Sequence, residues 1–160
     1  MSFLFILNFQ LTMASLIAFK KDHAHSMVQG IMNSSYTQVD ENLRPLLDGL
    51  EVKDMSFTAI DNNKNIICSG GIIPLWKGVY EGWVMASELS FKHPVTSAKV
   101  IKQGLHFLVN KFDVVRLQTA VKKDFSTGKK FAEWLGMTLE GEMPKYQNEQ
   151  DYLRYARIYK

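Results

Sequence analysis

The sequence has little cysteine and lacks long apolar runs. Its single cysteine, Cys68, cannot form a disulfide within the chain, and it cannot supply the set of thiolates that a cysteine-bound metal needs. The apolar run at residues 3–7 is far shorter than the roughly 20 residues that cross a bilayer. These scarcities exclude a disulfide scaffold and an N-terminal membrane helix, and they predict a cytoplasmic protein.

The sequence also lacks a large excess of charge of one sign. The 19 Lys and Arg residues stand against 16 Asp and Glu residues, which gives a formal net charge of +3 at pH 7. An excess this small and dispersed does not create a face that follows phosphates, so we expect no nucleic-acid partner. We expect no metal site either, because His23 and His25 lie two residues apart on a predicted helix and point in different directions.

The domain organisation is predicted from composition and from the two methionines near the start. Met13 precedes a better strand opening than anything upstream, so residues 1–12 are predicted to be an extension outside the core. Residues 13–160 are expected to form one domain, because a hydrophobic content of 46% is enough for a single core.

Hydrophobic spacing in the first half of the chain predicts a strand, two helices and a three-stranded meander. The expected helices cover residues 21–32, with Asp22 as N-cap, and 38–50, where Pro45 would kink an interior turn. The expected strands cover residues 16–19, 56–60, 66–73 and 79–88. The last three form the meander, with turns at 61–65 and 74–78.

The second half predicts a helix, a strand, a helix and a two-stranded ribbon. The first of these helices starts at Pro94 with Thr96 or Ser97 as N-cap, and the second covers residues 126–135 with Ser126 as N-cap and Gly136 as its end. The expected strands cover residues 114–121, 137–143 and 151–158, with a turn at 144–150.

This order of elements, together with the segment 124–141 (DFSTGKKFAEWLGMTLEG), resembles the GNAT family of acyl-coenzyme A N-acyltransferases over residues 14–158. Gly136 and the Glu140-Gly141 pair align with the family pattern without gaps. The resemblance implies an α/β (α+β) fold of three layers. In that fold a mixed, mostly antiparallel central sheet is splayed between the strands near 79–89 and 114–121 and is flanked by helices.

The resemblance also implies an acetyl-CoA-dependent N-acetyltransferase without a metal. In such a protein the pantetheine would run beside residues 87–89 as an added edge strand, and the pyrophosphate would lie on the helix end near Thr96. The partners implied are acetyl-CoA and an unidentified amine acceptor, and the final ribbon would be a pairing surface for a homodimer. The cofactor-binding residues implied in this way are Leu89, Phe91, His93, Thr96, Ser97, Ala98, Lys99 and Phe125.

The resemblance assigns the general base to Glu88, because an attacking amine must lose a proton. The tyrosine that protonates the leaving thiolate in the family is Ala132 here, and the frequent asparagine at the start of that helix is Phe125. Tyr155 is selected as the substitute acid, with Tyr146 and Tyr152 as alternatives. In the pyrophosphate loop, residues 93–98, only the last position matches the family pattern.

A narrower resemblance, from Ile60 onward, is to acetyltransferase-like proteins of tailed bacteriophages, which would place the protein in a host cytoplasm or in a virion. Two functions therefore stay open. The first is an N-acetyltransferase, and the second is a GNAT-fold binding or structural protein that no longer catalyses.

Overall fold

The computed structural model describes residues 14–32 and 44–160, so the predictions for residues 1–13 and 33–43 lie outside the described residues. The chain divides into two compact units. Unit 1 comprises Met1–Ile73 and Trp83–Leu108, and unit 2 comprises Pro74–Gly82 and Val109–Lys160. The single domain expected for residues 13–160 stays a prediction.

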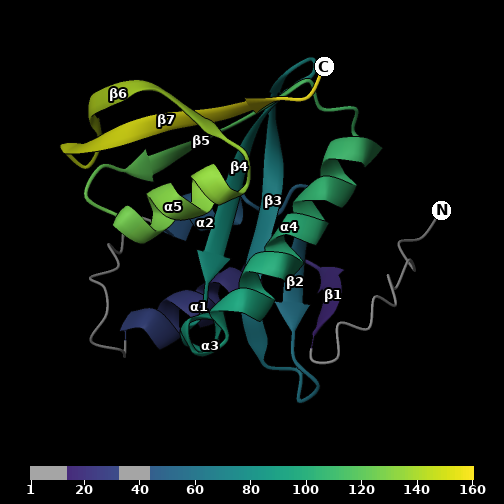
Figure 1. The fold of residues 1–160 in the computed structure, drawn as a ribbon. Helices are drawn as coiled ribbons and strands as arrows, with labels where there is room; N and C mark the ends of the chain where they lie inside the picture. The colour runs from purple at the N-terminus through teal and green to yellow at the C-terminus, as the bar shows by residue number, and fades with distance from the viewer. Residues whose placement is uncertain (1–13, 33–43) are drawn as a thin grey trace. The chain divides into compact units, whose positions relative to one another are not determined.

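The elements follow one another as drawn in Figure 1. In order they are β1 (Ser15–Ala18), α1 (Lys21–Met32), α2 (Arg44–Asp48), β2 (Ser56–Ile60), β3 (Ile66–Trp76), β4 (Val79–Ala86), α3 (Glu88–Lys92), α4 (Pro94–Lys111), β5 (Arg116–Lys122), α5 (Ser126–Trp134), β6 (Thr138–Gln147) and β7 (Gln150–Ile158). The strand order is β1-β2-β3-β4-β5-β7-β6. Since β4 and β5 pair in parallel while β1–β2, β2–β3, β5–β7 and β6–β7 pair antiparallel, the predicted mixed, mostly antiparallel sheet is confirmed.

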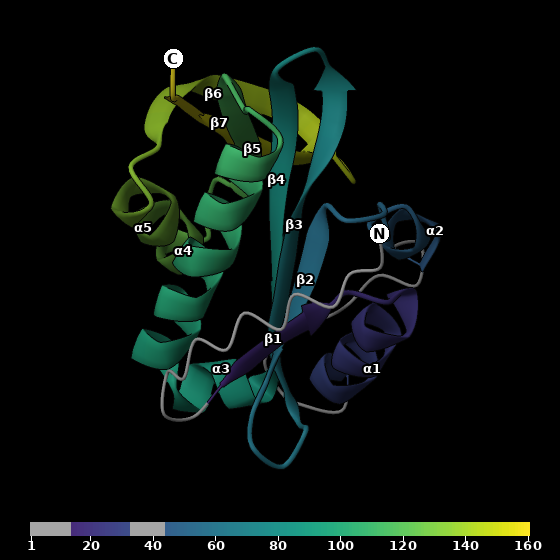
Figure 2. The same cartoon turned by 90° about the vertical axis from the view of Figure 1, so that its right-hand side faces the viewer.

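In unit 1, α1 and α4 lie on opposite sides of β2 and β3 (Figure 2). On the α1 side, four buried apolar side chains form a cluster that Trp83 and Met85 of β4 also contact. The four are Phe19, Ala24, Leu47 and Leu50. On the α4 side, the ring of Phe57 packs directly over Gly104. Strand β2 and the first part of β3 are thus buried on both faces, whereas β1 is largely exposed.

The start of α1 differs from the prediction. The helix begins at Lys21, so the N-cap is Lys20, and the prediction of Asp22 as N-cap was wrong. The Lys21 N–H donates to a carboxylate oxygen of Glu51 at 2.7 Å, and the Lys20 N–H donates to Nδ1 of His23 at 3.2 Å. The Glu51 carboxylate and the His23 ring therefore accept the backbone N–H groups at the start of α1, and the side chain of Asp22 is not needed as a cap.

The second helix is described only from Arg44 to Asp48, since the earlier part of its predicted range lies outside the described residues. Pro45 lies in the first turn of this helix, where its missing N–H breaks no intrahelical bond. This is why proline does not interrupt the described helix.

Strand β2 and the turn at 61–65 are confirmed, but the predicted turn at 74–78 was wrong. Strand β3 continues through Pro74 to Trp76, and the turn is reduced to residues 77–78, where Gly78 has φ of +76°. The register of β2 with β3 ends at Gly71. Pro74 therefore lies beyond the end of β2, where a missing ladder N–H removes no bond to that strand.

The boundary between β4 and α3 also differs from the prediction. The strand ends at Ala86 rather than Glu88, and Glu88 is the first residue of a helix. Ser87 turns the chain: its N–H donates to the Ile67 carbonyl, and its hydroxyl donates to the carbonyls of Ile66 and Ile67. The Ser90 N–H then donates back to the Ser87 carbonyl and begins α3.

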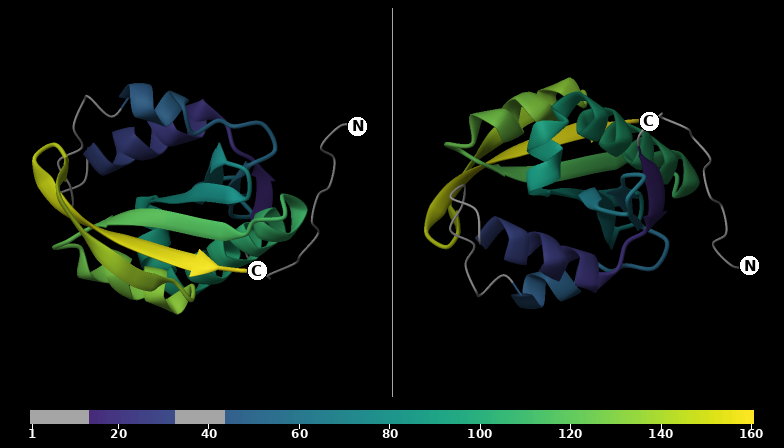
Figure 3. Two further views of the ribbon diagram at one scale, coloured as in Figure 1. Left: turned by 90° about the horizontal axis from the view of Figure 1, so that it is seen from above. Right: turned by 90° about the horizontal axis from the view of Figure 1, so that it is seen from below.

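In unit 2, α5 lies along one face of the β6–β7 ribbon (Figure 3). The predicted end of α5 at Gly136 is confirmed, with φ of +82°. The Gly136 N–H donates to the Glu133 carbonyl, and the Met137 N–H donates to the Ala132 carbonyl. These two bonds form a Schellman motif, which needs a residue that tolerates the left-handed conformation.

Two other predictions in unit 2 were wrong. Phe125, not Ser126, is the N-cap of α5, and it makes no side-chain capping bond. The final turn is not residues 144–150 but the pair Asn148-Glu149, both with positive φ. Such a pair matches a tight two-residue hairpin turn, for which glutamate gives no sequence signal.

Across residues 14–32 and 44–160, the helices fall short of the length and apolar character that a bilayer-spanning helix needs.

Candidate functional site

The junction of α3 and α4 in unit 1 carries most of the predicted site residues. Helix α4 begins at Pro94, and the Ser97 N–H donates to the His93 carbonyl at 3.0 Å. The N-cap is therefore His93, and the prediction of Thr96 or Ser97 was wrong because both lie within the first turn. The Ser97 hydroxyl donates to the same His93 carbonyl at 2.8 Å.

The geometry of the first turn leaves donors pointing out of the helix end. Pro94 has no N–H, and the N–H groups of Val95 and Thr96 precede the first donor that has an intrahelical partner. The Val95 side chain is 66% exposed, so this helix end is open to solvent. An 18-residue helix presents the positive end of its dipole here.

Charged and hydroxyl residues lie close to these two N–H groups in the sequence. Lys92, His93 and Lys99 are exposed, and Thr96 is partly buried with its hydroxyl in the first turn. His93 also lies near the Asp61 carboxyl, whose pKa is lowered mainly by hydrogen bonds from Asn65 and further by the His93 charge. This set of two N–H groups, a hydroxyl and ammonium groups suits a diphosphate.

Glu88 and its neighbours occupy α3. Glu88 is exposed at the first position of the helix, Leu89 is partly buried, and Phe91 is 61% exposed. Because these residues are helical and the Ser87 N–H already bonds Ile67, the segment offers no strand edge. The prediction that a pantetheine pairs with residues 87–89 as an added strand was therefore wrong.

The other two predicted residues, Phe125 and Tyr155, lie in unit 2. Phe125 is 50% exposed, and its ring lies over Gly128. Tyr155 is 2% exposed, and its hydroxyl donates to Oε1 of Glu133 at 3.3 Å. Burial, followed by the Glu133 charge, raises the pKa of Tyr155. The hydroxyl thus lies beside Glu133, the residue that follows Ala132. Ala132 is the position at which the tyrosine of the family would stand.

The predicted site residues therefore form two groups. The group in unit 1 is brought together by α3 and α4 and contains Glu88, Leu89, Phe91, His93, Thr96, Ser97, Ala98 and Lys99. The group in unit 2 contains Phe125 at the start of α5 and Tyr155 on β7.

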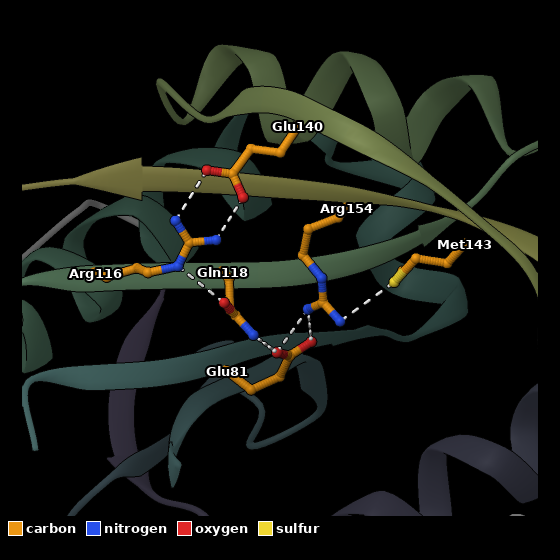
Figure 4. A network of polar contacts seen from close by, with 6 residues as sticks. All are labelled: Glu81, Arg116, Gln118, Glu140, Met143 and Arg154. Carbon is orange, nitrogen blue, oxygen red and sulfur yellow. Dashed lines mark hydrogen bonds and ion pairs between the residues drawn. The ribbon is translucent and has the colours of Figure 1, made fainter. Parts of the chain in front are cut away.

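Sequence reasoning missed a polar network on unit 2, which Figure 4 shows. Arg154 donates from Nη1 to both carboxylate oxygens of Glu81, at 2.9 and 2.8 Å. Gln118 donates to Glu81 at 3.1 Å and accepts from Nε of Arg116, which also forms a bidentate pair with Glu140. These residues come from four strands, so no local pattern reveals the network.

The network spans the parallel β4–β5 ladder. That ladder pairs Val79 with Arg116, Tyr80 with Leu117 and Glu81 with Gln118. Strand alternation puts Arg116 and Gln118 on one face and buried Leu117 on the other. The next residue of β5, Thr119, donates its hydroxyl to the Gly82 carbonyl at 2.9 Å, so side chains extend the attachment of the two strands.

Among the residues that the structure describes, no group of three His, Cys, Asp or Glu side chains could hold a metal ion. His25 pairs with Asp48 at 3.0 Å, whereas His23 bonds Thr58. Cys68 is fully buried, and burial raises the pKa of its thiol to about 12. Cys68 therefore has the character of a small apolar residue rather than of a nucleophile.

Neither a protein-family model nor a curated protein matches this chain. Solved structures do match. A chimera of the spermidine N-acetyltransferase SpeG from Vibrio cholerae and hSSAT has a TM-score of 0.70 and 14% identity, covering 91% of this chain and 95% of the other. An acetyltransferase (GNAT family) from Bacillus anthracis has a TM-score of 0.67 and 14% identity, covering 91% and 94%.

A third match is the ribosomal-protein-S5-alanine acetyltransferase from Vibrio fischeri, with a TM-score of 0.68 and 13% identity over 91% of this chain and 92% of the other. Identities this low carry information about the fold and not about the substrate. With its strand order and its helices, the chain has the fold of the GNAT acetyltransferases.

Proposed function

We propose that this protein is an acetyl-CoA-dependent N-acetyltransferase that acts on an amine. The observation that carries the proposal is the open N-terminus of α4, where the Val95 and Thr96 N–H groups, the Thr96 hydroxyl and the nearby lysines suit a pyrophosphate. When bound, acetyl-CoA supplies an activated acetyl thioester. Helix N-termini bind phosphates with backbone donors, so the departures of residues 93–97 from the family pattern do not remove the site.

Glu88 is proposed as the general base. An amine that attacks a thioester carbonyl must lose a proton as the nitrogen–carbon bond forms, and an exposed carboxylate can accept that proton directly or through water. Glu88 lies at the first position of α3, where the helix dipole also favours negative charge. It is in the same unit as the helix end proposed to bind the cofactor.

Tyr155 is proposed as the general acid that gives a proton to the leaving thiolate. Its hydroxyl bonds Glu133 of α5, next to Ala132. Tyr155 on β7 would thus supply the tyrosine hydroxyl that α5 lacks at Ala132. Because the pKa of Tyr155 is raised by burial and by Glu133, the hydroxyl keeps its proton throughout the neutral pH range. The exposed Glu133 carboxylate fixes the direction of that hydroxyl.

Two substitutions at helix starts test the cofactor site. A carboxylate at Thr96 would repel a pyrophosphate, so Thr96→Glu should weaken acetyl-CoA binding at least about tenfold in calorimetry. Thr127→Glu makes the same change in the first turn of α5 and should leave the affinity within about twofold. Equal effects of the two substitutions, or absence of wild-type binding at about 1 mM acetyl-CoA, would refute the site.

Tyr155→Phe should lower kcat about a hundredfold, a typical loss for a general acid, while the free energy of unfolding changes by no more than about 1 kcal/mol. The assay is thiol release from acetyl-CoA with a panel of amines that includes spermidine and an alanine-ended peptide, the acceptor types named for the similar structures. Tyr152→Phe, which removes a hydroxyl from the same strand, is the control and should retain activity. Equal activities of the two variants would exclude Tyr155 as the acid.

The second candidate function is a GNAT-fold binding or structural protein, including a component of a phage virion. The observation that favours it is Ala132, because the family's acid is missing from its usual place. In that case acetyl-CoA would give no binding heat and no thiol release. Homodimer formation through the final ribbon and residence in a cytoplasm belong to the enzyme proposal, and sedimentation and cell fractionation test them.

A further inference from the structure

A chain of three polar side chains joins the first turn of α1 to the sheet of unit 1. Nδ1 of His23 lies 2.8 Å from the Thr58 hydroxyl on β2, and that hydroxyl lies 2.8 Å from the Ser69 hydroxyl on β3. Thr58 and Ser69 are 0% exposed, so water does not compete for these bonds. The same Nδ1 accepts the backbone N–H of Lys20 at 3.2 Å.

These bonds fix the protonation state of His23. The Lys20 N–H can only donate, so Nδ1 must carry a lone pair and the ring proton must be on Nε2. The Thr58 hydroxyl then also donates to Nδ1, at the shorter distance, so that the single lone pair is shared between the two donors, and the Ser69 hydroxyl donates to Thr58. The whole chain therefore points from β3 towards α1 and requires a neutral imidazole.

We propose that His23 is an acid-sensitive latch that holds the first turn of α1 on β2. A proton added at Nδ1 leaves the Lys20 N–H without its acceptor. It also turns Nδ1 into a donor, opposite a Thr58 hydroxyl that is itself donating. The hydroxyl chain then has to reverse, and the N-cap of α1 loses a bond in the same event. Protonation thus releases the start of α1 from the sheet.

The charges around His23 set the direction of this response. Burial lowers the pKa of His23, Asp22 and Glu51 oppose that effect, and Lys20 adds to it. The neighbours from β2 and β3 are the uncharged Thr58 and Ser69, and Phe19 contacts the ring edge-on with centroids 6.0 Å apart. Since the folded state favours the neutral ring, its stabilisation is complete above the unfolded pKa and is lost as pH falls through the folded pKa.

The test compares two histidines of one helix by NMR and amide exchange. His25 pairs with Asp48 at the surface, so His25→Asn is the matched control for His23→Asn. In the wild type, the exchange of the Lys20 and Lys21 amides, corrected for its intrinsic pH dependence, should rise about tenfold between about pH 8 and about pH 5. His23→Asn should abolish this rise and His25→Asn should keep it.

The proposal does not depend on any catalytic activity. It is overturned if the corrected exchange of the wild type is the same at both pH values, or if the rise survives in His23→Asn. Should His23→Asn fail to fold, the wild-type titration decides: the Lys20 amide must be released with the same midpoint as the titration of the His23 ring.

Discussion

Replacing Gly104 by alanine should destabilise unit 1 by about 2 kcal/mol, the typical cost of overpacking less the gain in helix propensity. A Cβ at this position would lie within 3.0 Å of the Phe57 ring carbons Cε1, Cζ and Cδ1. The ring cannot move aside easily, because Phe57 is buried and has close-packed neighbours. The midpoint of urea unfolding at constant slope measures this loss.

Two further variants make the Gly104 prediction specific. Phe57→Leu in the Gly104→Ala background should recover part of the loss, because the smaller side chain frees the space that the new methyl group needs. Gly141→Ala is the matched control, since a Cβ there meets nothing within 4 Å. If Gly104→Ala unfolds at the wild-type urea concentration, the close packing of α4 on β2 is not as described.

Replacing Glu88 by glutamine should lower kcat for amine acetylation about a hundredfold, while the affinity for acetyl-CoA stays within about twofold. Glutamine has the shape of glutamate but cannot accept the proton of the amine. The loss should shrink as pH rises, because more of the amine is then deprotonated before it binds. Rate profiles against pH, together with calorimetric titration, separate a lost base from a lost binding group.

Glu149→Gln serves as the control for this substitution because it makes the same change in the exposed β6–β7 turn. It should leave both kcat and acetyl-CoA affinity unchanged. If the Glu88→Gln variant has wild-type kcat at every pH, Glu88 is not the general base. It is then only an exposed residue at the start of α3.

The parts of the fold that the sequence predicted well are those with local causes. Apolar spacing predicts α1 with its observed bounds, and the short β2 has its observed bounds as well. Gly136 ends α5 because the Schellman motif there needs a positive φ, which glycine tolerates best. Each of these features is decided by residues within one or two turns of one another.

The wrong helix caps have non-local or backbone causes. Asp22 has the side chain of a good N-cap, yet Glu51, 30 residues from Lys21, accepts the donor at the start of α1. At α4 and α5 the predicted caps, residues with hydroxyl side chains, lie inside the first turn, after His93 and Phe125. Neither of those two residues is a favoured N-cap, so sequence preference could not select them.

The local structure around the predicted site residues differs from the prediction. Glu88 was expected on a strand, but the bonds of Ser87 to Ile66 and Ile67 start a helix there, and those partners lie about 20 residues upstream. The pair of Glu81 and Arg154 spans 73 residues and leaves no local pattern. The burial of Tyr155 and its bond to Glu133 are also non-local, and the sequence does not predict either.

The central claim is that the N-terminus of α4 binds the pyrophosphate of acetyl-CoA, and backbone amide NMR during an acetyl-CoA titration tests it most directly. The amide signals of Val95 and Thr96 should shift with saturation, because their N–H groups would gain a charged acceptor. The amides of Ser126 and Thr127, at the start of α5, should move less. If Val95 and Thr96 do not shift at about 1 mM acetyl-CoA, or if only other amides shift, the proposed cofactor site is contradicted.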